Sequence, residues 1–138
     1  MSISLILSGI AAVILQVLGI NWIAALLLFL TMIVEVQSGI KASGKRGEPK
    51  SSMKMSRFTF KLFVYLIVIA TPYNFATSYA DSGNTLGAQI FEWIHVALIL
   101  QVWREYTISI LENLATINGK PKEQYLNLFE EKLKSFLK

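Results

Sequence analysis

The sequence contains no cysteine, a single histidine and three prolines in 138 residues. Without cysteine the chain cannot form disulfide bonds or thiolate metal sites, and one histidine cannot complete a histidine metal site. We find no pairing of nucleophile and base. The glycines at 44 and 47 lack the spacing of a phosphate-binding loop. The sequence therefore predicts a protein that is not an enzyme and needs no metal or other cofactor.

Charge is also scarce, and it is unevenly distributed. Charged residues make up 16% of the chain and hydrophobic residues 54%, and the mean hydropathy is +0.51. Residues 1–40 and 62–103 contain no Lys or Arg. A soluble fold must cover its surface with polar groups, so this composition predicts an integral membrane protein with the lipid bilayer as its partner. The basic residues lie beside apolar runs, which favours an orientation signal over a nucleic-acid surface.

Four apolar runs organise the chain. A helix of 18 residues is about 27 Å long, just enough for a hydrocarbon core of about 30 Å. We therefore predict an all-α membrane protein of one domain, residues 1–138, with three to four transmembrane helices and a C-terminal amphipathic cytoplasmic helix. The predicted spans are residues 3–20, 22–40, 58–80 and 86–103.

The first run leaves the number of spans open. It could cross the membrane as one arm of a tight hairpin, or it could lie in the interface before a single crossing. A cleaved signal peptide is disfavoured, because no basic residue precedes the run and no convincing cleavage site follows it. Ser4, Ser8, Ala12 and Gln16 recur every four residues. This stripe would let another helix approach closely, although small residues are common in spans anyway.

The basic residues locate the cytoplasmic side. Seven of the thirteen fall between residues 41 and 61, so we predict that a loop over 41–57 and the C-terminus are cytoplasmic under either span count. Glu35 and Lys61 mark the membrane boundaries of the flanking spans. We expect Glu35 to pair with Lys41 or Lys45 rather than to act as a proton or ion site.

Polar side chains interrupt the third and fourth apolar runs. Pro72 predicts a kink or an early helix end in the third run. In the fourth run, Glu92 and His95 are three residues apart, so a helix would permit them to pair. Polar side chains in a span need a partner helix or water, so we predict pore-lining or interhelical roles. The candidates are Gln16, Gln89, Glu92, His95 and Gln101.

The fourth run continues as an amphipathic extension over residues 104–118. Asn118-Gly119 is a helix stop, and residues 121–138 form a second amphipathic helix. This tail either docks on the protein or lies on anionic lipid. We predict a structural corner at the membrane surface for Glu112 and Asn113, with Asn113 bonding exposed backbone. The alternative is that both belong to a solvated helix face.

Several of these motifs occur in a recognisable order. An acidic residue ends an apolar run at Glu35, Ser38-Gly39 and Ala42 follow, and a basic loop contains Gly47-Glu48 and Ser51-Ser52. Lys61 then opens a span, and the block Ser109-Ile110-Leu111-Glu112-Asn113 precedes a break and a charged helix. This order resembles the toxin-secretion/phage-lysis holins over about residues 22–137. The family usually has Asp where Glu35 stands and Thr-Gly where Ser38-Gly39 stands.

The resemblance implies a small protein of the bacterial cytoplasmic membrane that forms homo-oligomers. These oligomers would open a pore or lesion through which a lytic enzyme or a toxin leaves the cell, without direct contact being required. It carries over no catalytic residues. Two other functions fit the same spans: an anchoring or structural subunit that forms no pore, and a small ion-channel or transporter component in which Glu35 or Glu92 titrates.

Overall fold

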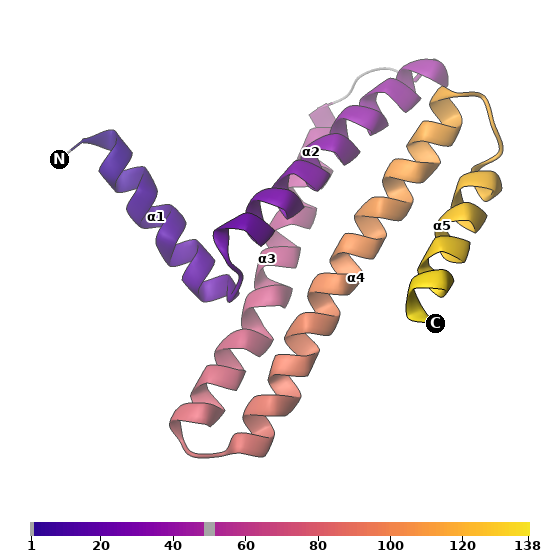
Figure 1. The fold of residues 1–138 in the computed structure, drawn as a ribbon. Coiled ribbons are helices and arrows are strands. Elements are labelled where there is room, and N and C mark those ends of the chain that lie inside the picture. The colour runs from indigo at the N-terminus through magenta and orange to yellow at the C-terminus, as the bar shows by residue number, and fades with distance from the viewer. Residues whose placement is uncertain (1, 49–51) are drawn as a thin grey trace. The chain divides into compact units, whose positions relative to one another are not determined.

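The computed structural model describes residues 2–48 and 52–138, and for residues 52–57 it describes the backbone only. These residues form five α-helices, and the described part of the chain contains no strand. The prediction of an all-α membrane protein is confirmed. The helices are α1 (Ile3–Leu18), α2 (Trp22–Lys45), α3 (Ser52–Asp81), α4 (Thr85–Ile117) and α5 (Lys122–Leu137), as Figure 1 shows.

Two asparagines begin helices after tight turns. Asn21 Oδ1 accepts a hydrogen bond from the backbone N–H of Ala24 (2.7 Å) at the start of α2. Asn84 Oδ1 accepts one from the N–H of Gly87 (2.9 Å) at the start of α4. The first N–H groups of a helix have no partner within the helix, so each asparagine supplies one. These starts fall at the gaps between the predicted spans, at residue 21 and at residues 81–85.

Three helices are long and apolar enough to cross a membrane: α2, residues Phe58–Asp81 of α3, and α4. Helix α1 has 16 residues, about 24 Å, and falls short of a hydrocarbon core of about 30 Å. Helix α3 continues through Pro72, which is buried, so the early helix end does not occur.

The predicted loop over 41–57 is shorter than expected. Helix α2 runs to Lys45 and α3 begins at Ser52, so both flanks of the basic stretch are helical. Lys50 and Ser51 lie outside the described residues, as do the side chains of Lys54 and Arg57. The flanks can be helical because Lys and Ser do not break a helix, and a positive charge at Lys45 is favourable in the last turn of α2.

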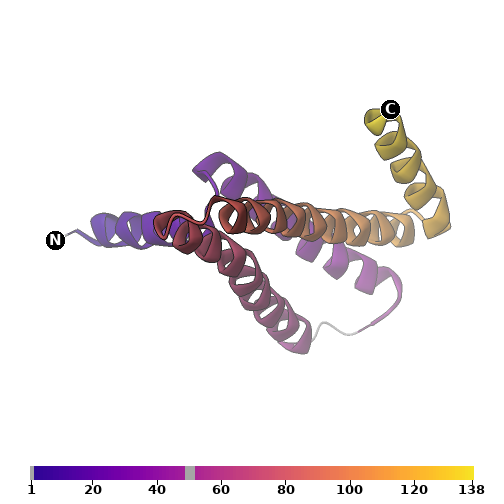
Figure 2. The same cartoon turned by 90° about the horizontal axis from the view of Figure 1, so that it is seen from below.

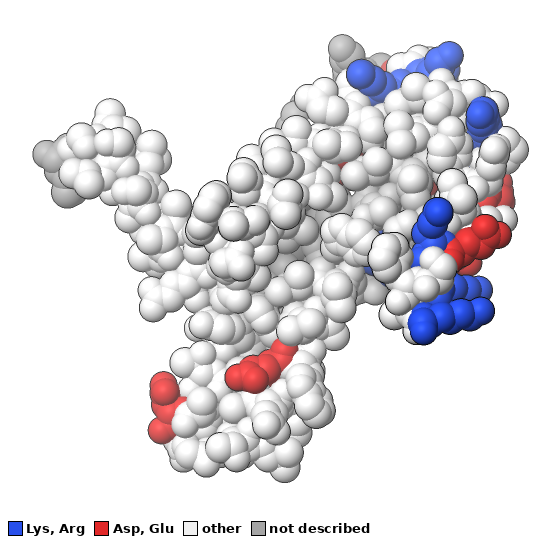
Figure 3. All heavy atoms as spheres, viewed as in Figure 1, with Lys and Arg blue, Asp and Glu red and all other residues white. Residues whose placement is uncertain are grey.

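The chain falls into two compact units, both built from parts of the long helices. Unit 1 comprises Met1–Leu28 and Thr59–Val102, and unit 2 comprises Phe29–Phe58 and Trp103–Lys138. Of the 13 basic and nine acidic residues, only Lys61, Asp81 and Glu92 belong to unit 1. On the face drawn in Figure 3, Lys and Arg accordingly gather over α5 and the C-terminal end of α2, which are parts of unit 2. Figure 2 shows α5 leaving the end of α4 at an angle within that unit.

Candidate functional site

Four polar side chains join α2 to α4 in unit 2. Ser109 Oγ donates to Glu35 Oε1 (2.9 Å), and Asn113 Nδ2 donates to Ser38 Oγ (3.1 Å). Ser38 Oγ in turn donates to the backbone oxygen of Glu35 (3.0 Å). We call Glu35, Ser38, Ser109 and Asn113 the α2–α4 polar cluster. Two direct hydrogen bonds between the helices fix their register, since each donor reaches only one turn of the partner helix.

The spacing of these residues explains why they meet. Glu35 and Ser38 are three apart, and Ser109 and Asn113 are four apart, so each pair occupies one helix face. Beside them, Gly39 lacks a side chain, and a Cβ there would lie 3.6 Å from Asn113 Nδ2. Ser38, Ala42 and Ser43 of α2 are buried. Small buried residues are typical of helices that pack closely in membranes.

Two expectations for these residues are wrong. Glu35 is half-buried and forms no ion pair with Lys41 or Lys45, because its carboxylate faces Ser109 on α4. Asn113 bonds a side chain rather than exposed backbone, and α4 runs on to Ile117 without a corner. The side chain of Glu112, next along the helix, is half-buried, and its backbone oxygen accepts from Thr116 Oγ1 (3.2 Å).

A second polar arrangement, in unit 1, holds the C-terminal end of α1. Asn74 Nδ2 of α3 donates to Val17 O (3.0 Å), and His95 Nε2 of α4 lies 2.7 Å from Leu18 O. A carbonyl oxygen only accepts, so Nε2 carries the hydrogen. The last carbonyls of a helix lack partners within it, and these two side chains supply them from neighbouring helices. We call Asn74 and His95 together with these carbonyls the α1 anchor.

Two further residues complete the α1 anchor. Gly19 ends α1 with a φ of +67°, a left-handed conformation that favours glycine, and its N–H donates to Leu15 O (3.0 Å). A Cβ at Gly19 would overlap the ring of Tyr73. The Tyr73 ring lies 5.3 Å from the His95 ring, centroid to centroid. His95 is 7% exposed, whereas Asn74 lies on the surface of the chain, so only the His95 side of the anchor is buried.

The other polar candidates in the apolar helices lie on the surface of the single chain. Gln16, Gln89, Glu92 and Gln101 are exposed, whereas His95 is buried. Glu92 does not pair with His95, which turns instead toward α1. In the described part of the chain, Gln89 and Glu92 make no side-chain hydrogen bond or ion pair, and large apolar side chains such as Trp93 (72% exposed) lie next to them. Lys61 is half-buried and lies over the Tyr65 ring, 5.5 Å from its centroid.

Both sites hold helices together through hydrogen bonds between polar groups. Within residues 2–48 and 52–138 no group of three or more His, Cys, Asp or Glu side chains could hold a metal ion. The α2–α4 polar cluster consists of residues that sequence patterns had singled out. The α1 anchor was missed at Tyr73 and Asn74. No local pattern indicated these residues, because the carbonyl that Asn74 bonds is 57 positions away at the end of α1.

Comparison with known protein families identifies one family that matches the chain. No curated protein and no solved structure matched the chain. The model of the bacteriophage holin family matches residues 12–135, a range that includes the α1 anchor, the α2–α4 polar cluster and nearly all of α5. This match covers all three helices that are long enough to span a membrane and agrees with the resemblance carried by residues 35–61 and 109–113. The chain belongs to the bacteriophage holin family.

Proposed function

We propose that copies of this protein assemble in the bacterial cytoplasmic membrane and open a pore or lesion through which a lytic enzyme or a toxin is released. In this proposal the holin works by self-association and performs no chemical step. The α2–α4 polar cluster and the α1 anchor hold each copy together, and the exposed surfaces of the apolar helices make the contacts between copies.

One observation supports this function above the others: the carboxylate of Glu92 is exposed in the apolar part of α4 and has no hydrogen-bond or ion-pair partner among the described residues. A charged side chain facing lipid at the centre of a span costs about 2.5 to 3.5 kcal/mol on insertion scales. Gln89, one turn earlier, shares this surface. Contact with another copy, or water in a pore, would remove that cost. A single chain in lipid is thus the less favourable state, and assembly relieves it.

The experiment replaces Glu92 with leucine and follows two readouts in expressing bacteria. These are the membrane potential and the release of a folded cytoplasmic reporter enzyme. Glu92→Leu removes the cost of exposing a charge to lipid, so we expect smaller assemblies in detergent and delayed or lost reporter release. Glu131→Leu is the matched control, because it makes the same substitution at an exposed position of α5. It should release the reporter like the unaltered protein.

The two readouts also separate the rival functions. Loss of potential without release of the reporter, in the unaltered protein, would identify a small ion channel. Unchanged potential and no release would identify an anchoring subunit. Equal release and equal assembly size for Glu92→Leu and the unaltered protein would refute the role of Glu92.

A further inference from the structure

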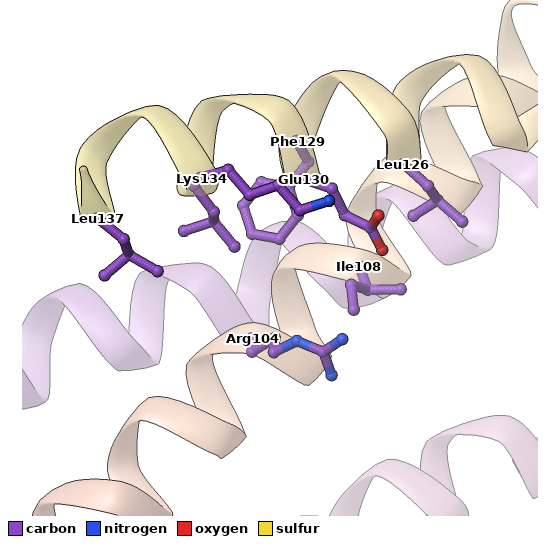
Figure 4. A pocket seen from close by; sticks show the side chains of 8 residues that line it. Arg104, Ile108, Leu126, Phe129, Glu130, Lys134 and Leu137 are labelled. Atoms are coloured by element: carbon purple, nitrogen blue, oxygen red, sulfur yellow. The ribbon is translucent and has the colours of Figure 1, made fainter.

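An open groove lies between α4 and α5 in unit 2. The groove has a volume of about 220 Å³ and is bordered by Arg104 and Ile108 of α4 and by residues of three turns of α5. Figure 4 shows the labelled side chains of α5 and Ile108 of α4 where the two helices face each other, with Arg104 farther along α4. Trp103 and Phe129, with ring centroids 6.1 Å apart, make one contact that holds the helices together. The volume is below the range of about 300–1,000 Å³ for pockets that enclose whole small molecules, so it suits part of a longer molecule.

The floor of this groove is apolar and its border is cationic. Ile108, Phe129 and Leu133 supply apolar surface, and Arg104 and Lys134 supply positive charge. Within the described residues, neither cation forms an ion pair or a side-chain hydrogen bond. Glu130 is the one carboxylate in the lining, so the lining carries a net positive charge. A ligand that matches it has a negative group beside a hydrocarbon segment.

The position of the groove along α4 indicates which ligand with a negative group and a hydrocarbon segment lies close to it. Arg104 is the first Lys or Arg after Lys61, so it stands where the apolar part of α4 ends. Arginine at such a boundary reaches the lipid headgroups. Helix α5 runs back alongside α4 (Figure 1), and Leu137 lines the same groove as Arg104. Its exposed end residues Phe136 and Leu137 are each 86% exposed, as expected for side chains that enter an interface.

We propose that the groove between α4 and α5 binds an anionic phospholipid, with its phosphate at Arg104 and Lys134 and part of an acyl chain against Ile108, Phe129 and Leu133. Arginine and lysine hold phosphate by charge-assisted hydrogen bonds, and the apolar floor replaces water around the chain. This inference concerns a lipid site on each copy and does not rest on pore formation. It would tie α5 to the cytoplasmic leaflet.

The test is native mass spectrometry of the full chain in neutral detergent, titrated with phosphatidylglycerol or with phosphatidylcholine of the same acyl chains. We expect one phosphatidylglycerol per chain to bind in preference to phosphatidylcholine. The double variant Arg104→Gln and Lys134→Gln should bind phosphatidylglycerol about tenfold or more weakly, because it loses both charge-assisted contacts. The double variant Lys122→Gln and Lys138→Gln has the same change in charge outside the groove and should bind normally.

Three further arms define what would overturn the proposal. Ile108→Trp fills the floor and keeps both cations, so it should also weaken binding. Excess inorganic phosphate should not displace the lipid, and displacement would mean a free-anion site. Glu130→Gln should bind phosphatidylglycerol at least as well as the unaltered protein.

If instead Glu130→Gln and Arg104→Gln both abolish self-association, the groove holds a second copy. Circular dichroism establishes that the variants fold, and the exposed single variant Lys134→Gln tests the site if the double variant does not.

Discussion

At the scale of single residues, Ser38 and His95 differ from Gln89 and Glu92 in burial and in their hydrogen-bond partners among the described residues. Ser38 and His95 are buried and bonded to neighbouring helices, whereas Gln89 and Glu92 are exposed on apolar helix surface. Buried polar groups need partners because an unmade hydrogen bond inside a bundle is costly. The first group therefore stabilises one copy, and under the proposed function the second group makes the contacts between copies.

Asn113→Ala tests the first group. It removes the hydrogen bond to Ser38, so we expect the free energy of unfolding in mixed micelles to fall by about 0.6 kcal/mol, the average for such bonds between membrane helices, and by no more than about 1.7 kcal/mol. Asn127→Ala, at an exposed position of α5, is the control and should change it little. Equal losses in the two variants would show that the Asn113 bond adds nothing to stability.

At the scale of elements, α1 differs from the other helices in how it is held. Its residues from Ile3 to Ile14 are exposed, and Leu18 at its end is its one buried residue. The α1 anchor provides hydrogen bonds to the last carbonyls only. A helix fixed at one end has few contacts to resist local opening, so α1 is the element most easily detached from unit 1.

The substitution Gly19→Ala should detach α1 from the rest of unit 1. Alanine at a φ of +67° is strained by about 1 to 2 kcal/mol, and its Cβ would also overlap the Tyr73 ring. Gly119→Ala is the matched control, because Gly119 has a φ of +65° and nothing within 4 Å of an added Cβ. We expect faster hydrogen exchange across the C-terminal half of α1 in Gly19→Ala alone. The same exchange rates in both variants would mean that the Tyr73 contact does not hold α1.

At the scale of the whole molecule, charge is segregated between the two units. Unit 1 has three charged residues and unit 2 has the remainder. Basic segments stay on the cytoplasmic side, so the connection between α2 and α3 and the C-terminus are expected there. With α2, α3 and α4 crossing and α1 too short to do so, three crossings would place the N-terminus on the opposite side.

Epitope tags on the two ends test this topology. We expect an N-terminal tag to be accessible on spheroplasts before any lysis and a C-terminal tag to become accessible only after the membrane is disrupted. The reason is that an odd number of crossings separates the ends. A tag in the Ser82-Gly83 turn should behave like the N-terminal tag and serves as the control. If the N-terminal tag is protected, α1 crosses too and the chain has four spans.

The helices could be predicted well from the sequence because a lipid bilayer permits few backbone conformations. Backbone polar groups in a bilayer must bond within their own segment, so long apolar runs become helices and basic stretches decide orientation. The error at 41–57 arose because charge marks the end of an apolar run, not the end of a helix. The residues of the α2–α4 polar cluster were also visible as a local pattern.

What the sequence by itself determined is therefore the class, the helices and the family, whereas the cytoplasmic side stays a prediction from the basic residues. Only the tertiary structure decided which polar groups are partnered. Ser109 and Glu35 are 74 positions apart, and His95 and Leu18 are 77 apart. Local periodicity says which face of a helix is polar, but not which other helix meets that face. The close packing of small residues brings α2 and α4 together, and the free carbonyls at the end of α1 bind His95. His95 is therefore buried, whereas Glu92 remains exposed.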